Sequence, residues 1–208
     1  MNGYRNLHQN TGYVNIYFMY GNRNWRFLLG IGLIVVLIAI LLIIILNHTP
    51  VTIKQQKPMA AYANNPTVQV AMLVDGPVNA VSLHNQVLVV VSNSQTTFKI
   101  FQGYNDHLVK EKTYPMTEAS FHVFLRSLEY ANFNQGQTNP RLSQASGFCP
   151  TGDRFIFTYD RNGQQIERFW STSCGGIPHT FDGNLELTEQ LFVNQVPGYG
   201  NMISSLNL

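Results

Sequence analysis

Charged residues are scarce in this 208-residue chain, which has only 13 basic and 11 acidic side chains. Its net charge is +2, and its Lys and Arg residues form no cluster. A chain of this kind has no strong electrostatic field that would attract a polyanion. We therefore expect no nucleic-acid partner.

Catalytic motifs are also missing. The sequence contains no G-x-S-x-G, no H-E-x-x-H, no phosphate-cradling loop and no Rossmann glycine pattern. Four acidic residues fall in predicted turns or helix starts, where a carboxylate is favoured for capping alone: Asp153, Asp160, Asp182 and Glu186. A hydrolase that uses a pair of carboxylates is an alternative, but the sequence does not support it. We expect no enzyme, no catalytic residue and no cofactor.

The histidines do not suggest a metal site either. All six are scattered along the chain and form no close-spaced ligand set: His8, His48, His84, His107, His122 and His179. His122 lies beside the apolar stripe of a predicted helix, where a surface position is expected. The sequence therefore predicts no metal site.

What the chain does contain is one long apolar run, from Phe27 to Leu46, without a charged or hydrogen-bonding side chain. As a helix, these 20 residues would be roughly 30 Å long, which is the thickness of the hydrocarbon core of a bilayer. A buried core helix would need apolar partners on every side. A signal peptide has a shorter apolar region followed closely by a small-x-small cleavage site. We predict an uncleaved transmembrane helix at residues 27–46, with the lipid bilayer as its partner.

The flanks of this run predict its orientation. Arg5, Arg23 and Arg26 precede it with no acidic residue, whereas Lys54 and Lys57 follow it. The positive-inside rule places the more basic flank in the cytoplasm, and Trp25 and Arg26 lie where interfacial anchors are found. We expect residues 1–26 to be a polar cytoplasmic tail and the protein to be a single-pass signal-anchor protein of the cell membrane.

Beyond the apolar run, residues 47–66 contain three prolines and no alternation, which is typical of an extended tether. Residues 67–208 would then form an extracytoplasmic domain. About five or six strands are predicted there, from the segments 68–74, 87–91, 96–102, 108–114, 153–159 and 164–171. The continuous apolar run 87–91 predicts a central strand that is covered on both faces. The expected fold class is α+β, with an antiparallel sheet.

A helix is predicted between the fourth and fifth strands. Thr117 can cap it, and an apolar stripe follows at i, i+3, i+4 and i+7, formed by Phe121, Phe124, Leu125 and Leu128. A short C-terminal helix is expected at about 185–195, with Asn184 as its cap. Residues 134–147 form a polar loop that is unusually long for a compact domain.

The two cysteines flank the predicted hairpin, whose Asn162-Gly163 turn is a strong hairpin signal. Folding the hairpin about Arg161 and Asn162 brings Cys149 and Cys174 to its open end. An even cysteine count in an oxidising compartment predicts a disulfide, which would stabilise the fold by roughly 3 kcal/mol. One alternative is a thiol nucleophile at Cys174 that acts with His179. Another is a zinc site formed by Cys149, Cys174 and His179.

The C-terminal region shows a resemblance. The sequences Trp170-Ser171-Thr172-Ser173-Cys174, Phe181-Asp182-Gly183-Asn184 and Leu191-Phe192 resemble the C-terminal part of uncharacterised bacterial single-pass envelope proteins. This resemblance implies no known activity. The order of sheet, helix, hairpin and closing segment is also similar, in layout only, to emfourin-type protease inhibitors, which are small α+β domains.

These observations favour a membrane-anchored, non-enzymatic binding or structural module of the cell envelope, with a protein, a peptide or a wall polymer as its partner. The alternatives are an accessory subunit of a secretion or pilus-type assembly, and a domain like a protease inhibitor.

Overall fold

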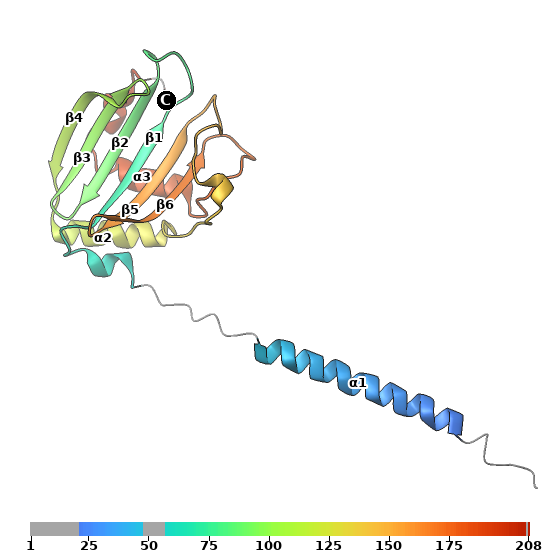
Figure 1. Cartoon of the computed structure of the whole chain (residues 1–208). Coiled ribbons are helices and arrows are strands. Elements are labelled where there is room, and N and C mark those ends of the chain that lie inside the picture. Colours follow the sequence, from blue (N-terminus) through green and yellow to red (C-terminus); the bar gives the residue numbers. More distant parts are fainter. Residues whose placement is uncertain (1–20, 48–56, 207) are drawn as a thin grey trace, which may run out of the picture. The chain divides into compact units, whose positions relative to one another are not determined.

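The computed structural model describes residues 21–47, 57–206 and 208, and it divides into two compact units, residues 1–55 and 56–208 (Figure 1). The first 20 residues of the predicted tail and residues 48–56 of the predicted tether lie outside the described residues.

The first unit contains one helix, α1 (Gly21–Asn47), which extends the predicted helix 27–46 at its N-terminal end. Side-chain surroundings are described for Trp25 and for residues 27–43, and all of these side chains are exposed. Within the described residues, a search for helices with the length and apolarity of a membrane span finds none.

The second unit is built on one antiparallel sheet of six strands (Figure 1). The strands are β1 (Gln69–Asp75), β2 (Asn85–Ser92), β3 (Gln95–Gln102), β4 (His107–Pro115), β5 (Arg154–Arg161) and β6 (Gln164–Thr172). Their order is β4-β3-β2-β1-β5-β6, so the hairpin β5–β6 joins the meander at β1. The predicted α+β class and antiparallel sheet are confirmed.

The helices cover one face of this sheet. Alternate residues of β1 and β2 point to that face and are buried, which is the period-2 pattern of a strand with one covered face. On the other face, Leu88 and Val90 are half-buried. The expectation that the run 87–91 is covered on both faces is therefore wrong, because no helix among the described residues packs on that side of β2.

The main helix is α2 (Glu118–Tyr130), and its four stripe residues are buried, as predicted. Thr117 caps it, with its side chain accepting a hydrogen bond from the backbone N–H of Ser120. The C-terminal helix α3 (Leu185–Val193) has the predicted Asn184 cap. A further helix, α4 (Tyr199–Ile203), was not predicted because its five residues are too few to show a period.

The compact unit begins earlier than predicted. Met59–Tyr62 form a short 3-10 helix, η2, in which Met59 and Ala60 are buried. These residues pack into the main core, and the backbone N–H of Ala60 donates to Glu129 of α2. The tether prediction for 47–66 must therefore be corrected, since residues 59–66 belong to the folded unit.

The β5–β6 hairpin also differs in register from the prediction. Arg161 pairs with Gln164, so Asn162 and Gly163 form the two-residue turn, rather than Arg161 and Asn162. Both turn residues have positive φ angles, of 55° and 73°, which a hairpin turn of this type requires. A bulge between Tyr159 and Asp160 shifts the register by one more residue.

Candidate functional site

The polar loop 134–147 packs on the face of the sheet opposite the helices. It contains a short 3-10 helix, η3 (Pro140–Leu142), and pairs with the chain after β6 through the bridge between Gly136 and Phe181. A second apolar cluster holds it in place, formed by Ala145, Ile156 and Trp170 together with Leu73, Leu142 and Phe148. The loop is therefore part of the packed structure.

Two long-range hydrogen bonds fix the loop to β6. The indole N–H of Trp170, which is fully buried, donates to the backbone oxygen of Leu142 at 2.6 Å. The guanidinium Nη1 of Arg168 donates to the backbone oxygen of Ser143 at 2.8 Å. The two contacts place the end of η3 directly over the middle of β6.

A pocket of about 370 Å³ lies between this loop and β6. This volume is at the lower end of the range found for small-molecule sites. Its lining comes from the loop, from Arg168 on β6 and from Thr180 on the returning chain, and consists of Gln137, Thr138, Asn139, Pro140, Leu142, Ser143, Arg168 and Thr180. No acidic side chain is among them.

The polar side chains of the pocket are partly engaged within the protein. Thr180 accepts a hydrogen bond from the backbone N–H of Trp170, and Asn139 accepts one from that of Arg141. Gln137 donates to the backbone oxygen of His179. Each group keeps further hydrogen-bonding capacity: the hydroxyl of Thr180 can donate, as can the Asn139 amide nitrogen, and the Gln137 amide oxygen can accept.

The predicted disulfide is present. Cys149 and Cys174 are bonded, with their Cα atoms 5.8 Å apart. The bond joins the chain just before β5 to the chain just after β6. Since both sulfur atoms are in the disulfide, neither is a free thiol that could serve as a nucleophile or as a zinc ligand. Within the described residues, no group of three metal-ligating side chains comes together.

A buried polar cluster lies at one end of the sheet, where β1 ends and β5 begins. Asp75 lies 2.9 Å from the guanidinium Nη2 of Arg154 and 3.1 Å from Nε2 of His84. Nδ1 of His84 lies 3.0 Å from the backbone oxygen of Pro77, and its ring stacks on Tyr104. The cluster thus ties the β1–β2 loop to β5 and to the β3–β4 turn. Sequence reasoning missed it because its members are far apart in the chain.

The same end of the sheet exposes apolar side chains. They come from the β1–β2 loop, from the β3–β4 turn and from the start of β4, and are Val78, Val81, Leu83, Tyr104 and Leu108. We call these five residues the apolar tip. The hydroxyl of Tyr104 donates to the backbone oxygen of Asn79, and the backbone N–H of Val78 donates to that of Pro150. These bonds hold the apolar tip in a fixed conformation.

Of the four acidic residues singled out from the sequence, Asp153 and Asp160 have pKa values raised by burial. Burial also raises the pKa of Glu189 on α3, and the nearby charges of Asp153 and Glu186 add to this effect. Glu189 was not a sequence candidate. Asp153 lies close enough to Glu189 for its charge to raise the pKa of Glu189, whereas Asp182 is exposed. All three of these carboxyl groups with raised pKa values lie outside the lining of the pocket described above.

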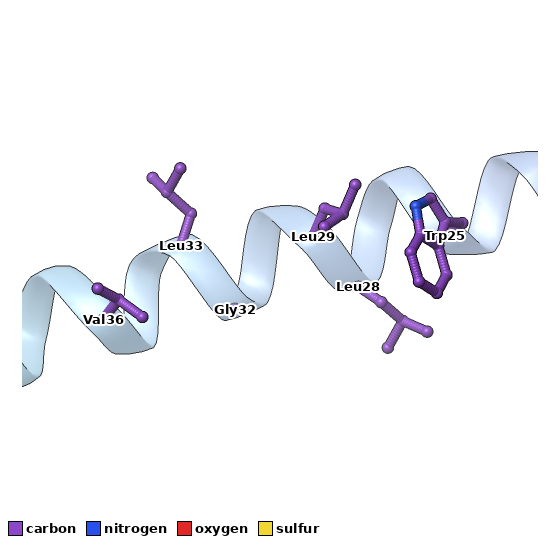
Figure 2. Close-up of a pocket in the computed structure, with 6 residues that line it drawn as sticks. All are labelled: Trp25, Leu28, Leu29, Gly32, Leu33 and Val36. Carbon is purple, nitrogen blue, oxygen red and sulfur yellow. The ribbon is translucent and has the colours of Figure 1, made fainter.

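Helix α1 carries a hollow of its own (Figure 2). It is lined by Trp25, Leu28, Leu29, Gly32, Leu33 and Val36, and Gly32 contributes no side chain. All of these residues come from one helix, so the hollow is a surface groove. The residues predicted to anchor the chain in the membrane are Trp25, Arg26 and the two ends of the apolar run, Phe27 and Leu46, and of these Trp25 and Phe27 are exposed. The side chains of Arg26 and Leu46 lie outside the described residues.

The sequence indicated the loop 134–147 as unusual but did not predict its pocket. Arg168 and Thr180 carry no motif, and only the β5–β6 register and the return of the chain bring them to the loop. A comparison with protein-family models and with curated proteins finds no match to this chain.

Proposed function

We propose that this protein is a membrane-anchored, non-enzymatic binding module of the cell envelope, whose pocket at the loop 134–147 holds the ligand. The observation that carries this proposal is the pocket itself, which is lined by amide, hydroxyl and guanidinium groups and has no acidic side chain. Such groups orient a ligand through hydrogen bonds, whereas general acid–base catalysis needs a titratable group at the bound molecule.

The anchoring part of the proposal rests on α1. Its 27 residues include the uncharged stretch from Phe27 to Leu46, which is long enough to cross the hydrocarbon core of a bilayer. The arginines before this stretch favour a cytoplasmic N-terminus. The disulfide is consistent with this topology, because disulfides persist in oxidising, extracytoplasmic compartments. Protease added to intact cells should therefore remove the C-terminal unit.

A second candidate function is that of a subunit of a larger envelope assembly, such as a secretion or pilus-type machine. The apolar tip favours it, because exposed apolar side chains that lie together mark protein contact sites.

One experiment distinguishes the binding module from the assembly subunit. A photo-cross-linking side chain is placed at Thr138 in the pocket, at Leu83 in the apolar tip, and at Lys112 on the exposed strand β4 as a control. We expect intact cells to give a defined adduct from position 138 and none from position 112. The adduct should disappear in the Arg168→Gln variant, since this change alters the pocket.

A dominant protein adduct from position 83 alone, with none from position 138, would instead support the assembly subunit. Turnover of an envelope substrate by the purified chain, lost in a pocket variant, would show that the protein is an enzyme and that the proposal is wrong.

A further inference from the structure

Arg168 is the one charged residue among those that line the pocket. Among the described residues it forms no ion pair, and its cross-strand neighbour on β5 is the neutral Thr158. The adjacent Glu167 pairs with Tyr159, whose side chain is buried on the helix-covered face. Because neighbouring residues of a strand point to opposite faces, Glu167 faces away from the pocket. Within the described part of the chain, no acidic side chain therefore balances the positive charge of Arg168 at the pocket.

The guanidinium is also held in position. Its Nη1 donates to the backbone oxygen of Ser143, which fixes the side chain against the rim of η3. Nη2 and Nε remain as a pair of donors, and this fork matches the two oxygens of a carboxylate. A single guanidinium among neutral groups suits a singly charged anion.

The neutral groups of the pocket suit a polyhydroxylated ligand. Hydroxyl and amide groups that can both donate and accept surround the guanidinium, and they belong to Thr138, Asn139, Ser143, Thr180 and Gln137. Pro140 and Leu142 add an apolar wall. A sugar ring presents hydroxyl groups at its edge and C–H groups on its faces, so it can use both kinds of surface.

A peptide fits the same pocket less well. Peptides bound in an extended form usually pair with free backbone groups of the receptor. Here the backbone N–H groups of Gln137, Leu142 and Thr180 all donate within the protein. The lining thus offers mainly side-chain groups.

From these observations we infer that the pocket binds an acidic saccharide of an envelope polymer, with the sugar carboxylate on Arg168. This inference rests on the proposed function and names the ligand class of the same site. Arg168 provides the charge selectivity, and the amide and hydroxyl side chains contact the sugar hydroxyls.

The test is a titration of the full-length chain in detergent micelles, followed by calorimetry, with three probes: D-glucuronate, D-glucose and N-acetylglycine. We expect glucuronate to bind about tenfold more tightly than glucose, because a charge-assisted bond is stronger than a neutral one. N-acetylglycine, which carries a carboxylate but no sugar ring, should show no saturable binding.

Matched variants assign the effect to Arg168. Arg168→Gln should remove the preference for glucuronate, so that glucuronate and glucose bind with equal affinity. Arg141→Gln is the control, since it removes the same charge from η3 at a residue that does not line the pocket. Arg168→Lys keeps the positive charge but lacks the forked pair of donors, so it should retain part of the preference for glucuronate over glucose. If the substitutions at position 168 acted only by disrupting the loop, the lysine variant would show no such preference.

Other results would overturn the inference. Equal binding of glucose and glucuronate would make this a neutral-saccharide site, and binding of N-acetylglycine as tight as that of glucuronate would make it a peptide-carboxylate site. If no probe bound while position 138 still gave its adduct in cells, the ligand class would be wrong but the binding module would stand. Loss of the adduct as well would remove the proposed function itself.

Discussion

Replacing Asp75 with Asn would leave the buried guanidinium of Arg154 without its ion partner. Arg154 is 3% exposed, and its Nη2 contacts both the Asp75 carboxylate at 2.9 Å and the backbone oxygen of Gly76 at 2.7 Å. The same carboxylate accepts a hydrogen bond from Gln86 and lies beside His84. An asparagine has nearly the same shape, so the substitution removes charge and little volume.

The expected loss follows from the burial of both groups. Removing one partner of a buried ion pair costs about 3–5 kcal/mol, because a charge is left in the protein without compensation. The Asp75 side chain is 20% exposed, which favours the lower end of this range. We expect about 3 kcal/mol, a large part of the total of roughly 5–15 kcal/mol for a typical domain. In a unit of this size, each kcal/mol lowers Tm by about 2–4 °C.

Chemical and thermal unfolding of the full-length chain, followed by circular dichroism, measures this loss. Asp106→Asn is the control, because Asp106 is exposed in the β3–β4 turn. A double-mutant cycle with Arg154→Met isolates the pair: the double variant should be at least about 2 kcal/mol more stable than the sum of the single changes predicts. A loss below about 0.5 kcal/mol for Asp75→Asn would refute the reasoning, since that is the size of an ordinary surface substitution.

Three further predictions concern other parts of the second unit. The double variant Cys149→Ala/Cys174→Ala should lose about 3 kcal/mol, as expected for a loop of 25 residues; mass measurement with and without reductant confirms the bond, and freely alkylatable thiols in native protein would contradict it. Leu125→Ala, at a fully buried site of α2, should cost about 2–5 kcal/mol, whereas Val123→Ala on the exposed side of the same helix should change stability by less than about 0.5 kcal/mol; equal losses would mean that the helix does not pack as described. Glu189→Gln should stabilise the protein at neutral pH. Burial raises the pKa of Glu189 in the folded state above its ordinary 4.5, so the stability of the unmodified protein falls as the pH rises from that value through the raised pKa. The variant should lack this fall in stability, which a Tm profile between about pH 4 and pH 8 measures. A fall that persists in the variant would show that another group is responsible.

The elements that were predicted well carry signals within a few residues of one another. The stripe of α2, its Thr117 cap and the Asn162-Gly163 turn each depend on local spacing, and the structure shows all three. The wrong predictions concern segments whose structure depends on residues that are distant in the sequence. The segment 47–66 has the composition of a tether, yet Met59 and Ala60 find room in the core beside α2. Composition could not show this, because burial depends on the surface that a distant helix offers.

Predicting the pocket would have required knowledge of contacts between segments that are distant in the sequence. Its charge comes from Arg168, a residue that looks like any polar position of an edge strand, and becomes distinctive only because the β5–β6 register places it beneath Ser143. That register differs from the one expected, because the turn lies one residue further along the chain and a bulge follows between Tyr159 and Asp160. A shift of one residue would turn Arg168 to the helix-covered face and bring Glu167 toward the loop. The register of β6 beyond the bulge therefore decides which of these two charged side chains faces the loop.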